Sequence, residues 1–93
     1  MSDLNRVAKR MYNIHPKAMR LVVGDDIEDT FSLKSAEFFQ TEFQAEGTRT
    51  GDDALYRFAT TDDNESVIVG RRAPGEDGWS MVGEVTAVER IDE

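Results

Sequence analysis

The sequence predicts a single α+β domain over residues 1–93, with an N-terminal helix packed on a curved, mostly antiparallel sheet of four to five strands. Three observations predict this fold class. Apolar side chains recur at helical spacing near the N-terminus, strand-forming runs alternate with turn clusters over residues 53–91, and glycines interrupt two of those runs. A chain of 93 residues is long enough for one small hydrophobic core.

The N-terminal segment, residues 1–20, is predicted to contain a short amphipathic helix. Its apolar stripe has three- and four-residue spacing and consists of Leu4, Val7, Ala8 and Met11. A proline disfavours helical geometry in the residue before it, so Pro16 is expected to end the helix.

Two later segments fit both a helix and a strand. Residues 17–23 contain two valines and are followed by Gly24, which favours a strand over the second helix of a helix-turn-helix. Residues 35–46 place Phe39 and Phe43 at helical spacing, yet the same stretch alternates apolar and polar residues as a half-buried strand does. Periodicity alone does not decide between these two structures for residues 35–46.

From residue 53 onward the pattern is typical of a β-meander. Two clusters of turn residues separate three runs that are rich in strand formers, residues 54–60, 66–72 and 79–91. Gly70 and Gly83 lie inside these runs and indicate bends or a bulge that curls the sheet toward a barrel. Together with the preceding Val-Gly-Asp-Asp-Ile of residues 23–27, this meander resembles small SH3-like barrels, over a few residues only and with no site implied.

The register of the meander decides which of its side chains are buried. Pairing Phe58 with Ile68, and Ile68 with Gly83, gathers an apolar face that we predict to be the core: Tyr56, Phe58, Ile68, Trp79, Met81, Val85 and Ala87. The opposite face is mixed and consists of Leu55, Arg57, Val69, Arg71, Val82, Glu84 and Thr86. Trp79 and Tyr56 are therefore expected in the core, and not on a surface that stacks nucleic-acid bases.

The chain is strongly acidic. It has 19 Asp and Glu against 11 Lys and Arg, which gives a net charge of −8. The carboxylates gather in short clusters, at residues 25–29, 52–53, 62–65, 76–77 and 92–93. By composition alone the chain resembles small uncharacterised acidic domains of halophilic, salt-accumulating archaea. This resemblance implies a cytoplasm in which concentrated salt screens the repulsion among carboxylates.

Charge is distributed unevenly along the chain. Residues 1–20 hold five basic residues and one acidic residue, whereas residues 21–93 hold six basic and 18 acidic residues. The basic arm either docks on its own acidic body or on a partner, or it contacts nucleic-acid phosphates. Docking is preferred, because charged runs are more often paired or solvated faces than binding sites. The residues that would contact nucleic acid are Arg6, Lys9, Arg10, Lys17 and Arg20.

No constellation of residues indicates catalysis. The chain has no cysteine, so thiol nucleophiles, disulfides and zinc–thiolate sites are excluded. His15, the only histidine, follows the predicted helix and has no nucleophile beside it in the sequence. The acidic run at residues 62–66 lacks the Gly and Glu that a calcium loop requires further along. We expect no catalytic residue, no metal and no cofactor.

Three arginines form a candidate site for an anion or a partner. Arg71 and Arg72 precede a glycine-containing reversal, and Arg57 lies on the same predicted face as Arg71. Guanidinium groups bind carboxylates and phosphates through paired hydrogen bonds. The competing interpretation is that Arg71 and Arg72 pair with carboxylates across the sheet, since no glycine-rich phosphate-binding motif accompanies them.

These observations favour a small cytoplasmic interaction or ligand-binding module without catalytic activity, acting as a homodimer or with a protein partner. No apolar run approaches the roughly 18 residues of a membrane span, so no membrane contact is expected. The alternative is a nucleic-acid-associated accessory factor that uses the basic arm. It is disfavoured because phosphate affinity falls steeply with salt.

Overall fold

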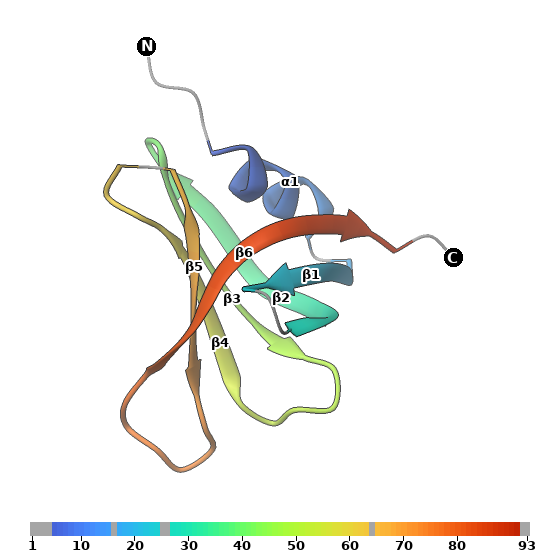
Figure 1. Cartoon of the computed structure of the whole chain (residues 1–93), viewed down its shortest axis with the longest axis vertical. Coiled ribbons are helices and arrows are strands. Elements are labelled where there is room, and N and C mark those ends of the chain that lie inside the picture. The colour runs from blue at the N-terminus through green and yellow to red at the C-terminus, as the bar shows by residue number, and fades with distance from the viewer. Residues whose placement is uncertain (1–4, 16, 25–26, 64, 92–93) are drawn as a thin grey trace.

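A computed structural model describes residues 5–15, 17–24, 27–63 and 65–91. One short helix precedes six strands, which pair antiparallel in chain order and close into a barrel (Figure 1). The elements are α1 (Arg6–Ile14), β1 (Met19–Val23), β2 (Ile27–Phe39), β3 (Glu42–Arg49), β4 (Leu55–Thr60), β5 (Val67–Arg72) and β6 (Ser80–Arg90).

The predicted α+β sheet of four to five strands is correct only in outline, because the structure is mostly β and its sheet is closed. Closure comes from β1, which pairs with β6 as well as with β2. The strand that the sequence did not predict is the first part of β2. In this part only Phe31 and Leu33 are buried and alternate with exposed residues, and the alternation ends at the shift in pairing with β3 between Leu33 and Ser35, so the apolar pattern is short.

Both ambiguous segments contain strands. Residues 17–23 include β1, as the valines favoured. Residues 35–46 are neither a helix nor one continuous strand, because they form the end of β2, a tight turn and the start of β3. Gln40 in this turn has a φ of 60°, and Phe39 pairs with Glu42 across it.

The helix α1 closes over the core by its apolar face. Asn5 caps it, since its side-chain oxygen accepts a hydrogen bond from the backbone N–H of Ala8 at 3.0 Å. Ala8, Met11 and Ile14 are buried, whereas Leu4 of the predicted stripe lies outside the described residues. The helix α1 is therefore packed on the barrel through apolar contacts. No helix in the described part of the chain has the length and hydrophobicity needed to cross a membrane.

The core is filled by side chains that point into the barrel. The largest of them are aromatic: Phe31, Phe43, Tyr56 and Phe58. Phe31 meets the rings of Tyr56 and Phe58 edge-on, with centroids 5.3 and 5.9 Å apart, a favoured geometry for aromatic pairs.

The register of the meander differs from the predicted one by one residue. Phe58 pairs with Val69 where Ile68 was expected, and Ile68 pairs with Glu84 where Gly83 was expected. A shift of one residue exchanges the two faces of a strand. Val69, predicted on the mixed face, is therefore buried in the core, and Ile68 lies on the outer surface of the barrel.

The predicted core face is accordingly wrong in part. Tyr56, Phe58 and Val85 are buried together, as expected. Trp79 and Met81 are outside the core, and Met81 is 72% exposed. The physical reason is an irregularity in the pairing of β5 with β6 between Val69 and Gly70: the glycine indicated a bulge here, but the predicted register did not include one.

Candidate functional site

Trp79, the only tryptophan, lies on the outer surface of the barrel immediately before β6. Its ring lies over β5, because its Cε3 atom is 3.5 Å from the position of a Cβ added to Gly70. The guanidinium carbons of Arg57 and Arg72 are 4.6 and 5.3 Å from the ring centroid. Both distances allow cation–π attraction. The ring is only half-buried, so these three side chains form an accessible group, the Trp79 cluster.

Local structure places the Trp79 cluster. The connection between β5 and β6 reverses at Ala73, whose carbonyl accepts from the N–H of Glu76 at 3.1 Å, and Gly75 follows with a φ of 83°. The chain thereby returns to β5. Arg57 pairs in register with Gly70, and Arg72 lies two residues beyond it on the same face. The two guanidinium groups consequently start on neighbouring strands and converge on one ring.

Two hollows adjoin the cluster. The first, of about 260 Å³, is mainly apolar and is lined by Arg57, Ala59, Ile68, Gly70 and Trp79. The second, of about 410 Å³, is more polar and is lined by Ser35, Glu37, Gln44, Ala45, Glu46, Arg57 and Ala59. Both include Arg57 and Ala59, so they are neighbours on the outer face of β4. A guanidinium at the boundary can therefore serve a ligand in either hollow.

Arg57 already has one carboxylate partner. Its Nη2 atom is 3.4 Å from Oε2 of Glu46, and both side chains are about half exposed. An ion pair of this length at the surface contributes little to stability. A carboxylate from another molecule can replace Glu46 at little energetic cost.

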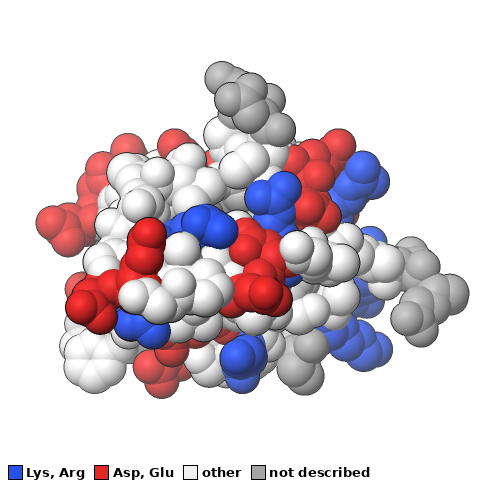
Figure 2. Space-filling model, turned by 90° about the horizontal axis from the view of Figure 1, so that it is seen from below, with Lys and Arg blue, Asp and Glu red and all other residues white. Residues whose placement is uncertain are grey.

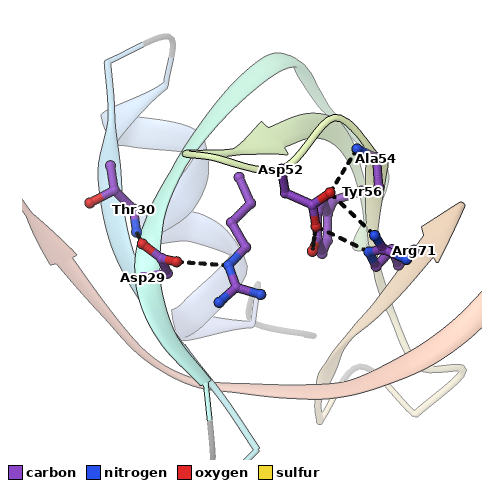
Figure 3. Close-up of polar contacts among 7 residues, drawn as sticks. Asp29, Thr30, Asp52, Ala54, Tyr56 and Arg71 are labelled. Carbon is purple, nitrogen blue, oxygen red and sulfur yellow. Dashed lines mark hydrogen bonds and ion pairs between the residues drawn. The ribbon is translucent and has the colours of Figure 1, made fainter. Parts of the chain in front are cut away.

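Arg71 does not belong to the Trp79 cluster, contrary to the prediction that Arg57, Arg71 and Arg72 act together. The one-residue shift pairs Arg71 with Tyr56 and turns it toward Asp52. Its Nε and Nη2 atoms donate to the two carboxylate oxygens of Asp52 at 3.1 and 3.2 Å (Figure 3). The hydroxyl of Tyr56 donates to the same carboxylate at 2.6 Å. The competing interpretation, an arginine paired with a carboxylate, holds for Arg71.

Asp29 and Arg49 form a second ion pair near the first, with 2.8 Å between the carboxylate oxygen and Nε (Figure 3). Arg71 lowers the pKa of Asp52 most strongly, followed by Tyr56 and the N–H of Ala54, and Arg49 likewise lowers the pKa of Asp29. Seen from below in the view of Figure 1, basic and acidic side chains are interspersed on the surface (Figure 2). The Asp52–Arg71 and Asp29–Arg49 ion pairs stabilise the barrel, and neither leaves its charged groups unpaired for chemistry.

The five basic residues predicted to contact nucleic acid do not stay together. Arg6, Lys9 and Arg10 on α1 line one hollow, joined by Arg90 of β6, which the sequence did not suggest. Lys17 follows the helix and does not line this hollow. Arg20 on β1 pairs with Glu28 at 3.2 Å.

The described residues contain no group of three or more His, Asp or Glu side chains that could hold a metal ion. In the acidic run at 62–66, Asp63 accepts from the hydroxyl of Thr61 and the N–H of Glu65, at 2.5 and 3.0 Å, as a turn residue does. Asn64 of that run lies outside the described residues. The ring of His15 contacts the carbonyl of Tyr12 at the end of α1.

Comparison with known proteins yields one match. The model of a family described as a domain of unknown function, DUF8072, matches residues 1–93. No curated protein and no solved structure is significantly similar to the chain.

Proposed function

The chain belongs to the DUF8072 family, whose function is unknown, and we propose that it is a binding module without catalytic activity. The Trp79 cluster and its two hollows are the proposed binding surface. The partner is a protein segment that carries carboxylates next to apolar side chains. A single observation carries this proposal: a partly exposed tryptophan between two arginines borders an apolar hollow on an otherwise acidic protein.

The closed barrel restricts how a partner can bind. Each strand pairs with a neighbour on both sides over at least part of its length, so no whole strand is left as an open edge of the sheet. Recognition then depends on side chains of the outer surface. Tryptophan and arginine are the residues that most often supply binding energy in protein interfaces. Arg57 and Arg72 would pair with carboxylates, and the hollow over Ile68 and Ala59 would take an aliphatic side chain.

The same surface suits the salt-rich cytoplasm that we propose as the habitat of the protein. Salt at about 1 M reduces the Debye length to roughly 3 Å, so long-range attraction between charges is lost. Contact ion pairs and apolar burial beside Trp79 depend less on long-range fields. A second copy of the chain is itself acidic and is one partner of the proposed class.

The fluorescence of Trp79 tests the proposal, because the protein has no other tryptophan. The probes are a short peptide of alternating Asp and Leu and a matched peptide of alternating Lys and Leu. We expect the acidic peptide to shift the emission in concentrated KCl, and R57A/R72A to abolish the shift. The matched variant R20A/R90A removes the same charge outside both hollows and should respond as the wild type does.

Two results would contradict the proposal. Equal shifts with the acidic and basic peptides would show that the arginines do not select carboxylates. Equal responses of R57A/R72A and the wild type would show that the ligand binds elsewhere. Sedimentation in high salt tests whether the partner is a second copy of the chain. If it is, the wild type should self-associate and R57A/R72A should not.

A further inference from the structure

The helix α1 has a basic face that the core does not use. Ala8, Met11 and Ile14 are buried, and the residues at three- and four-residue spacing on the adjoining face are exposed. These are Arg6, Lys9, Arg10 and Asn13. With Ile14 and Arg90 of β6 they line a hollow of about 570 Å³, which we term the basic hollow.

Among the described residues no carboxylate lines the basic hollow, although the chain has 19 acidic residues. Of the ion pairs formed by the described residues, none includes Arg6, Lys9, Arg10 or Arg90. Four cations around one concave surface repel one another. An anion placed among them would relieve that repulsion and gain several charge-assisted hydrogen bonds.

One hydrogen bond holds the basic hollow in shape. Nε of Arg10 donates to the backbone carbonyl of Val88 at 2.8 Å, which links α1 to β6. The bond leaves the two terminal nitrogens of Arg10 with no partner among the described residues. Because α1 is fixed to the strand that carries Arg90, the cations from the two elements keep their relative positions.

We propose that the basic hollow binds the phosphate groups of a nucleic-acid strand. Arg6 and Asn13 are seven positions apart, a rise of about 10 Å along a helix. A strand that runs along this length can therefore place more than one phosphate beside the basic hollow. The basic residues supply charge, and the amide of Asn13 supplies a neutral donor of the kind that contacts phosphates and sugars.

The structure redefines the set of contact residues that the sequence suggested. Lys17 and Arg20 lie outside the basic hollow, and Arg90 joins it from the other end of the chain. Four cations predict a slope of about −3 for the logarithm of affinity against the logarithm of salt with single strands. This slope is shallower than that of proteins with six to ten phosphate contacts, so affinity falls more slowly as salt rises.

The experiment is fluorescence anisotropy with a labelled single-stranded DNA, repeated over a series of KCl concentrations. The test variant is R6A/K9A/R90A, which spares Arg10 because Arg10 anchors α1. The matched control is K17A/R20A/K34A, which removes the same charge outside the basic hollow. At about 0.2 M KCl we expect the test variant to bind roughly thirtyfold more weakly, with a salt slope smaller by about 2. The control should keep the slope of the wild type.

The outcomes decide between the alternatives. Equal losses of DNA affinity in the two variants would mean that only the net charge of the protein matters, and the proposal would be wrong. Absence of DNA binding by the wild type, together with binding of inorganic tripolyphosphate, would assign the basic hollow to a small polyphosphate and would also overturn it. Circular dichroism at the same salt verifies that each variant is folded. Trp79 is not involved, so this result is independent of the peptide experiment.

Discussion

Gly47 on β3 lies so close to β2 that a Cβ added to it would stand 2.2 Å from the backbone carbonyl oxygen of Ser32. A second backbone atom, Cα of Leu33, would be 2.9 Å away. The contact coincides with the shift in pairing between Leu33 and Ser35, where β2 bends around the barrel. The approach of two backbones at this bend therefore requires a residue without a side chain.

Substitution of Gly47 by alanine should lower the free energy of unfolding by about 3 kcal/mol, because neither strand can move without breaking its pairing. The matched control is Gly70→Ala, whose Cβ would meet Trp79 at an ordinary contact distance of 3.5 Å. We expect the control to change stability by about 0.5 kcal/mol or less. Urea denaturation measures both, and equal midpoints for the two variants would refute the close approach.

The structure predicts that two methionines contribute very unequally to the free energy of unfolding. Met19 on β1 is fully buried and Met81 on β6 is 72% exposed. Met19→Ala should cost about 2–5 kcal/mol, since it leaves a cavity in the core. Met81→Ala should cost about 0.5 kcal/mol or less. If thermal denaturation showed Met81→Ala to be the more damaging change, the originally predicted face would be correct after all.

The ion pair of Asp52 with Arg71 predicts a pH dependence. The pKa of Asp52 is lower in the folded chain than its ordinary value, chiefly because Arg71 donates to the carboxylate. The resulting stabilisation is complete above the ordinary pKa and is lost as pH falls toward the folded pKa.

Asp52→Asn should therefore lower the melting temperature at neutral pH, and its difference from the wild type should shrink as pH falls from about 5 to 2. Asp53→Asn, at the exposed neighbouring position, is the control. A difference that stays constant over this pH range would show that the carboxylate charge is not responsible.

The acidic composition predicts that salt stabilises the protein. Raising KCl from about 0.1 M to about 3 M should raise the melting temperature, because screening reduces repulsion among the carboxylate clusters. A variant with Asp62→Asn, Glu76→Gln and Asp77→Asn, all exposed, should show a smaller rise. A melting temperature that does not increase with KCl in the wild type would argue against halophilic adaptation.

Local patterns predicted α1, β1 and the three strands of the meander, but not the first part of β2. The apolar spacing of α1 and the turn clusters around β5 concern residues close in sequence, and both features are present. The closure of β1 against β6 depends on residues more than 60 positions apart, which no local pattern reports. The irregularities at Leu33 and Gly70 follow from backbone geometry, and the register predicted for the meander, which allowed for no irregularity, is one residue off.

The same irregularities explain why the sequence predicted the candidate site only in part. Arg57 and Arg72 lie together at Trp79, but Arg71 was grouped with them only because the register was one residue off. The predicted register also placed Trp79 on the apolar face, and the irregularity at Gly70 puts it outside the core instead. Arg90 was missed because its neighbours on α1 are far away in sequence.

The pairing of the first strand with the last has a consequence for biosynthesis. While the protein is being translated, Met19–Val23 can find β2 early but has no neighbour on its other side until β6 has left the ribosome. Until then the growing chain exposes a valine-rich edge that invites pairing with other chains. The arrival of β6 therefore removes this edge as well as closing the sheet.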